Sequence, residues 1–241
     1  MQKRGIRMNR LYQKNEIGFA ILWIVIYVVG MSSADSISES IGIAKIVTLP
    51  LIAAMSLFLY VWLKKYGLQE KYGLCKAKRS GKEFLFFIPL LLVIFLQLAE
   101  GISINHPASA LMNFVFMLFV GFMEELIFRG FLFKAMEPDG LKSAVIVSAF
   151  TFGIGHIVNL FNGSQDMTLT LLQIVFAVFF GFCMVFLFYK GGSLLPCIAA
   201  HGFFNAFNAI APSSTHFPVL VIQMVLLAAY SFYLYRLADL K

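Results

Sequence analysis

The chain has 241 residues, of which 60% are apolar and only 13% are charged, with a formal net charge of +7 and a mean hydropathy of +0.85. A soluble domain of this size could not bury so much apolar surface, so the composition excludes that class and predicts a polytopic membrane protein. The positive charge is concentrated in loops, which indicates membrane topology and not nucleic-acid binding.

Eight apolar stretches approach the roughly 20 residues that a membrane-spanning helix needs. In chain order they are Ile17–Met31, Ile43–Leu63, Phe84–Ile104, Ala108–Phe133, Ser143–Phe161, Thr168–Tyr189, Gly192–Ala211 and Phe217–Tyr235. The connections between them are short and leave no room for a soluble domain. We therefore predict an all-α polytopic membrane helix bundle of about eight transmembrane helices. A basic N-terminus at residues 1–16 precedes a single membrane domain at residues 17–241.

The first stretch has an alternative interpretation as a cleaved signal peptide, because it follows a basic start and precedes Met31-Ser-Ser-Ala-Asp35. It contains Trp23 and Tyr27. It is also long for a signal peptide, whose apolar region usually runs about 7–15 residues. We favour a retained helix.

The distribution of lysine and arginine predicts the orientation. With a cytoplasmic N-terminus, every lysine and arginine except Lys45 falls in a cytoplasmic segment, and the outer loops carry Asp35, Glu39 and Asp166 instead. We predict an integral membrane protein with both termini in the cytoplasm. Lys45 is interpreted as interfacial. Other polar residues near outer helix ends are also set aside: Glu100, His106 and His216.

Two adjacent glutamates, Glu124 and Glu125, lie inside the fourth apolar stretch, where a charge costs roughly 2.5–3.5 kcal/mol or more. Glu125 and Arg129 are four positions apart and can meet on one helix face, whereas Glu124 lies about 100° round the helix. One carboxylate can then pair with the arginine while the other faces a cavity and exchanges a proton. The alternative is an interfacial ion cluster in which Arg129 reaches the cytoplasmic headgroups.

The fifth and seventh stretches each place polar side chains one helical turn apart. Phe152 and His156 share a face within Phe-Gly-Ile-Gly-His, whose glycines allow another helix or a substrate to approach the backbone. His201 and Asn205 share a face and could hold a carbonyl oxygen as negative charge develops on it. Each group alone is also typical of interhelical hydrogen bonding, with Asn208 as a further candidate. Together the three segments predict water activation and oxyanion stabilisation inside one bundle.

In chain order, Glu124-Glu125-x-x-x-Arg129, Phe152-x-x-x-His156 and His201-x-x-x-Asn205 resemble the motifs of the CPBP family, the CAAX-protease and bacteriocin-processing (Abi) intramembrane proteases. The resemblance covers residues 108–211, the expected catalytic core. It implies an eight-helix endopeptidase with its site below the membrane surface, reached from the cytoplasm.

The same resemblance implies a role for each matched residue. It implies that Glu124 is the base that activates water, that His156 assists it, and that His201 with Asn205 forms the oxyanion hole. It further implies that the remaining motif residues support this group from behind: Glu125, Arg129 and Phe152.

No cofactor is favoured. The cysteines, Cys75, Cys183 and Cys197, lack the spacing of metal ligands or of a disulfide framework, and the chain has no His-Glu-x-x-His motif. Zinc held by two histidines and one carboxylate is the alternative, with the ligand set Glu124, His156 and His201. Residues that would orient such ligands are not evident in the sequence.

We therefore predict a glutamate-dependent intramembrane endopeptidase that cuts a peptide bond near the cytoplasmic face of a bacterial plasma membrane. The compact size fits bacterial members of the family. A peptide or membrane-protein substrate, in peptide maturation or bacteriocin immunity, is therefore favoured over a prenylated C-terminus. The alternatives are a proton-coupled transporter, since buried Glu and His also build proton relays, and a non-catalytic immunity or scaffold protein. The lipid bilayer is an expected partner, nucleic acid is not, and the oligomeric state is left open.

Overall fold

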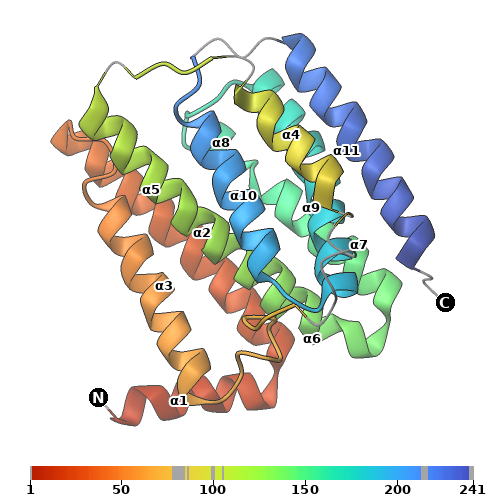
Figure 1. Ribbon diagram of the computed structural model, residues 1–241. Coiled ribbons are helices and arrows are strands. Elements are labelled where there is room, and N and C mark those ends of the chain that lie inside the picture. The colour runs from red at the N-terminus through yellow and green to blue at the C-terminus, as the bar shows by residue number, and fades with distance from the viewer. Residues whose placement is uncertain are drawn as a thin grey trace.

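The computed structural model describes residues 2–77, 85, 87–98, 101–104, 106–212 and 217–238, and every regular element in these ranges is a helix (Figure 1). The helices are α1 (Gln2–Lys14), α2 (Glu16–Ile41), α3 (Thr48–Lys65), α4 (Ile88–Leu98), α5 (Pro107–Glu124), η2 (Glu125–Phe133), α6 (Lys134–Met136), η3 (Glu137–Asp139), α7 (Leu141–Gly155), α8 (Val158–Phe161), α9 (Met167–Gly191), α10 (Leu195–Asn208) and α11 (Phe217–Ala238).

Within the described ranges, six helical segments are long and apolar enough to cross a membrane. They are Glu16–Ile41, Thr48–Lys65, Pro107–Asp139, Leu141–Phe161, Met167–Gly191 and Phe217–Ala238. Two predicted spans contain the shorter helices α4 and α10, with 11 and 14 residues. The predicted all-α membrane bundle is therefore confirmed. Several residues used in the sequence predictions lie outside the described ranges: Lys78, Arg79, Lys82, Phe84, Glu100, His216 and Lys241.

The first two spans differ from their predicted bounds. The first helix continues ten residues beyond Met31 and ends at Ile41, where Gly42 adopts the left-handed conformation (φ +78°) that caps helices. The candidate signal-cleavage segment therefore lies inside a continuous helix. The second helix begins at Thr48, because residues 42–47 form the turn that reverses the chain.

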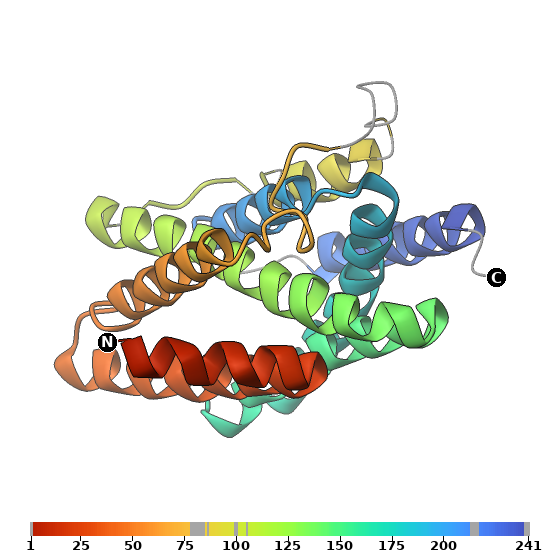
Figure 2. The same cartoon turned by 90° about the horizontal axis from the view of Figure 1, so that it is seen from below.

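The two ends of the bundle differ in charge. One end holds α1, the C-terminus of α3 and α6, and we call it the basic end because Lys64, Lys65 and Lys134 lie there (Figure 1). Helix α1 lies across this end, and the view from below shows it in front of the bundle (Figure 2). The opposite end holds the turn at residues 42–47, the N-terminus of α5 and α8.

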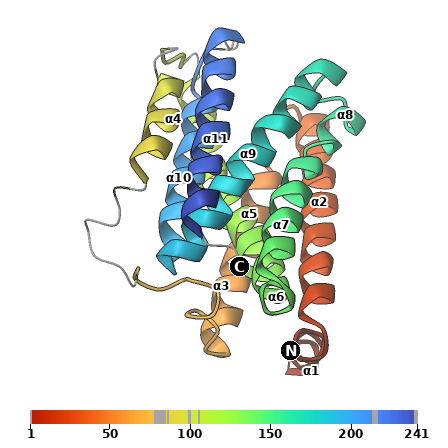
Figure 3. The same cartoon turned by 90° about the vertical axis from the view of Figure 1, so that its right-hand side faces the viewer.

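Close helix packing places the polar motifs around one space. Figure 3 shows α2 and α7 on one side of the bundle, α4 and α11 on the other, and α5 and α9 between them. A Cβ on Gly121 of α5 would lie 2.5 Å from the backbone nitrogen of Gly202, so α5 and α10 touch along their backbones. A Cβ on Gly153 of α7 would lie 3.0 Å from the nitrogen of Val178 on α9. The predicted close approach of another helix is confirmed at Gly153. A Cβ on Gly155 would meet no described residue within 4 Å, and the approach of a substrate there stays a prediction.

Candidate active site

The two glutamates lie at the junction between an α-helix and a π-helix. Helix α5 ends at Glu124, and residues Glu125–Phe133 continue as a π-helix in which every residue is buried. Single π-turns inside α-helices occur frequently at functional sites. The Glu125 side chain is completely buried, whereas that of Glu124 is 13% exposed and lines a cavity. The pair therefore has the two environments that the helical spacing predicts.

The Glu125 carboxylate forms an ion pair with Arg129 in the interior of the protein. The Oε1 atom of Glu125 lies 3.3 Å from Nη1 of Arg129, and both side chains are 0% exposed. The guanidinium carbon of Arg129 lies 4.2 Å from the centre of the Phe152 ring, in the range of a cation–π contact. The alternative in which Arg129 reaches the headgroups is therefore wrong, because its side chain is enclosed.

His201 connects the two carboxylates. Its Nδ1 atom lies 2.7 Å from Oε1 of Glu125, and its Nε2 atom lies 3.5 Å from Oε2 of Glu124. An ionised carboxylate only accepts hydrogen bonds, so Nδ1 donates to Glu125 and Nε2 is directed toward Glu124. Glu125 thus orients the imidazole, which agrees with the supporting role expected for it, although the sequence did not identify His201 as its partner.

Phe152 lies at the centre of the polar groups. Its ring centre is 5.4 Å from that of His156 and 5.6 Å from that of His201, with both pairs nearly perpendicular. The same ring covers the Arg129 guanidinium. One aromatic side chain therefore separates the buried cation from the two imidazoles and restricts the orientation of all three.

Two contacts at the site come from residues that the sequence did not mark. The Tyr27 hydroxyl of α2 donates a hydrogen bond of 3.0 Å to Oε1 of Glu124. The Phe180 ring of α9 packs 5.0 Å from the His201 ring. Tyr27 is separated from Glu124 by 97 positions, so no helical spacing relates them. The sequence signal for Tyr27 is only that it is a polar group within an apolar stretch.

A cavity of about 430 Å³ joins these groups. The residues predicted to act on a substrate all line it: Glu124, His156, His201 and Asn205. A smaller cavity of about 150 Å³ adjoins the same place, and it too is lined by Tyr27, Glu124 and His156. The structure therefore brings together groups from α2, α5, α7 and α10 on one hollow.

The alternative zinc site finds no support in the grouping of donor side chains. In the described part of the chain, no three His, Cys, Asp or Glu side chains are grouped so that they could hold a metal ion.

Residues 106–207 match the family model of the type II CAAX prenyl endopeptidases, described as Rce1-like. The match covers less than half of the chain, and over this segment the chain is similar to the CAAX protease family. It contains all the motif residues: Glu124, Glu125, Arg129, Phe152, His156, His201 and Asn205. No curated protein and no solved structure matches the chain. The resemblance seen in the sequence is confirmed by this match. The matched family is one of endopeptidases, and the six long apolar helices indicate an integral membrane protein.

Proposed function

We propose that the cavity hydrolyses a peptide bond with Glu124 as the general base. The observation that carries this proposal is the exposure of only one carboxylate of the pair to the cavity, with a hydrogen-bond donor at one oxygen and an imidazole nitrogen near the other. Tyr27 donates to Oε1, and His201 Nε2 lies 3.5 Å from Oε2. These contacts restrict the carboxylate to one orientation, which is what a positioned general base requires.

The reaction transfers a proton from water to the leaving amine. Glu124 takes a proton from a water in the cavity as the water oxygen attacks the carbonyl carbon of the peptide. His156, on the same cavity, takes this proton from Glu124 and passes it to the leaving amine when the carbon–nitrogen bond breaks, which returns both side chains to their starting state. The side chains of His201 and Asn205 donate hydrogen bonds to the oxyanion that forms between these steps.

Charge balance supports this role for His201. Nδ1 of His201 already donates to Glu125, so Nε2 can donate to an oxyanion only when the ring carries both protons. An imidazolium beside Arg129 then balances the two carboxylates, and the buried cluster has no net charge. A neutral cluster is favourable in a low-dielectric interior, where an unbalanced charge is expensive.

We further propose that the substrate is a bacterial peptide or membrane-protein segment, in peptide maturation or bacteriocin immunity. A prenylated C-terminus, the substrate type named in the family description, is the alternative. A panel of unmodified and farnesylated peptides distinguishes the two. Efficient cleavage of the unmodified peptides supports the proposed substrate, and cleavage of the farnesylated peptides alone supports the prenylated C-terminus.

The test is cleavage of this panel by purified protein in liposomes, followed by mass spectrometry. Wild type is compared with Glu124→Ala, His156→Ala and His201→Ala. We expect cleavage by wild type and a large loss in each variant. Cleavage that survives all three substitutions would remove the assignment. Ion flux without cleavage would favour the proton-coupled transporter, and partner binding without either would favour the scaffold protein.

A further inference from the structure

The basic end of the bundle is closed below the glutamates. All residues of η2, which runs from Glu125 toward that end, are buried. Nearer the basic end, aromatic rings from α1, α2, α3, η2 and the segment after α3 pack edge to face. The centre of the Phe131 ring lies 5.0 Å from that of Tyr72 and 5.1 Å from that of Phe19, and the Tyr12 and Trp62 rings are 5.2 Å apart. Interiors packed in this way have few voids larger than a water molecule.

Hydrogen bonds to backbone carbonyls also close the basic end. The Leu194 N–H donates to the carbonyl of Gly73 at 2.8 Å, and the Ser193 hydroxyl donates to the carbonyl of Cys75 at 2.7 Å. Gly73 has a positive φ of +68° and lies directly on the Phe188 ring. The segment after α3 is thereby fixed to the turn between α9 and α10, across the route from the basic end to the site.

The cavity instead extends toward the opposite end. Beyond the catalytic groups it is lined by polar side chains from the far ends of the helices: Asp35, Lys45, Gln97, Asn159, Gln165, Gln173 and Asn208. The amide of Asn159 donates to Gln173 at 2.8 Å, and that of Gln97 donates to Asn208 at 3.1 Å. Polar groups at membrane depth are tolerated where they line a water-filled space, so this wall indicates a hydrated passage.

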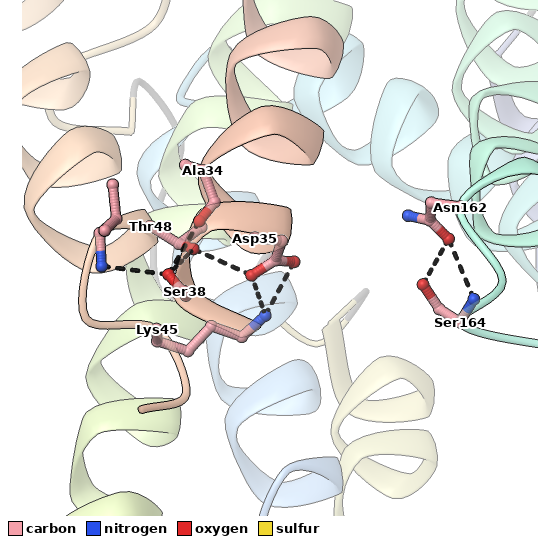
Figure 4. Close-up of polar contacts among 8 residues, drawn as sticks. Ala34, Asp35, Ser38, Lys45, Thr48, Asn162 and Ser164 are labelled. Atoms are coloured by element: carbon pink, nitrogen blue, oxygen red, sulfur yellow. Dashed lines mark hydrogen bonds and ion pairs between the residues drawn. The ribbon is translucent and has the colours of Figure 1, made fainter. Parts of the chain in front are cut away.

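An ion pair stands where the passage leaves the bundle. The Lys45 ammonium lies 2.7 Å and 3.0 Å from the two oxygens of Asp35, which also accepts from the Thr48 hydroxyl. Figure 4 shows this network at the end of α2, and on the other side of the view the Asn162–Ser164 pair of the segment between α8 and α9. Asp35 and Lys45 are partly exposed, at 37% and 23% of the side chain. Lys45, which the sequence suggests is interfacial, lines the mouth of the active-site cavity.

We infer that the active-site cavity is reached from the membrane face opposite the basic end, which is the extracytoplasmic face, and that the substrate is a peptide segment presented there. The assignment of faces follows from the positive-inside rule, because Lys45 is the only described lysine or arginine at the opposite end. The position of the amphipathic, basic helix α1 across the basic end agrees with this orientation. The nature of the substrate rests on the proposed function, whereas the direction of access does not. Cytoplasmic access, which the family resemblance implies, is the competing hypothesis.

Cysteine labelling in intact cells tests the direction of access. Gln165→Cys at the mouth and Gln173→Cys deeper in the cavity are introduced separately, each in a Cys75→Ser background. Cys183 and Cys197 stay in place because both are completely buried. The natural Cys75, half-buried at the basic end, serves as the matched control for the cytoplasmic face. A membrane-impermeant maleimide is applied to intact cells and to inverted membrane vesicles, and an unfolding midpoint in detergent close to that of wild type shows that the variants are folded.

We expect both cavity cysteines to be labelled in intact cells and Cys75 to be labelled only in inverted vesicles. Cavity cysteines that react only in inverted vesicles, or from neither side, would overturn the inference. Labelling of Cys75 in intact cells would overturn the assignment of faces. Labelling does not require proteolysis. A protein that is labelled from outside but cuts no peptide would therefore contradict the proposed function and leave the direction of access intact.

Discussion

The Nδ1 atom of His201 lies 2.7 Å from Oε1 of Glu125, although 76 positions separate the two residues in the chain. The same carboxylate oxygen lies 3.3 Å from the Arg129 guanidinium. One buried anion therefore holds both an imidazole of the active site and an enclosed cation. Among the described residues, the Arg129 nitrogens have no hydrogen-bond partner, so this ion pair and the Phe152 ring are what stabilise its charge.

Glu125→Ala is predicted to destabilise the protein strongly. Removing one partner of a buried pair leaves an uncompensated charge and costs about 3–5 kcal/mol. Thermal or denaturant unfolding in detergent measures the loss. The control is Glu137→Ala, which removes the partly exposed ion pair with Lys134 and should cost about 0–1 kcal/mol. Equal effects of the two substitutions would contradict the buried-anion interpretation.

Tyr27→Phe is predicted to lower kcat/KM without unfolding the protein. A hydrogen bond to a charged group contributes about 1.5–3 kcal/mol, which corresponds to a roughly 10- to 100-fold loss of rate. The variant loses the donor that fixes Oε1 of Glu124 and keeps the ring. Steady-state cleavage measures the effect, and Tyr60→Phe on the exposed face of α3 is the matched control. A Tyr27→Phe protein with unchanged kinetics would show that this contact does not position the base.

Gly121→Ala is predicted to reduce activity by separating α5 from α10. The added methyl group would lie 2.5 Å from the Gly202 nitrogen, so the helices that carry Glu124 and His201 must move apart. A displacement of about 1 Å at a catalytic group can cost roughly 100-fold in rate. Gly191→Ala at the end of α9 is the control, because its methyl group meets no described residue within 4 Å and should leave the rate unchanged. Similar rates for the two variants would rule out this packing constraint.

Local spacing explains which parts of the site could be predicted. Glu125 with Arg129, and Phe152 with His156, are four residues apart, so a helix alone brings each pair together. Apolar length predicts most spans for the same local reason. The Tyr27–Glu124 and His201–Glu125 contacts depend on how separate helices pack, and no spacing in the chain contains that information. The π-helix after Glu124 and the start of α3 at Thr48 depend on local backbone geometry that apolar content does not distinguish. The direction in which the cavity opens likewise depends on tertiary packing, because aromatic side chains of the described residues fill the space between the helices at the basic end and not at the opposite end.

Cleavage is predicted to be insensitive to metal chelators. The described histidines and acids are not grouped as a metal site. The rate with and without a strong chelator measures this directly. A loss of activity that added zinc restores would contradict the metal-free mechanism and favour Glu124, His156 and His201 as ligands.

The most direct test of the account is the cleavage rate of Glu124→Gln, because the amide keeps the shape of the side chain but cannot take a proton from water. Loss of a general base typically costs about 10²- to 10⁴-fold, so we predict a fall of that size in kcat with peptide binding retained. Glu137→Gln, outside the cavity, should cut at the wild-type rate. A Glu124→Gln protein that cleaves the same peptide as fast as wild type would contradict the assignment of Glu124 as the base.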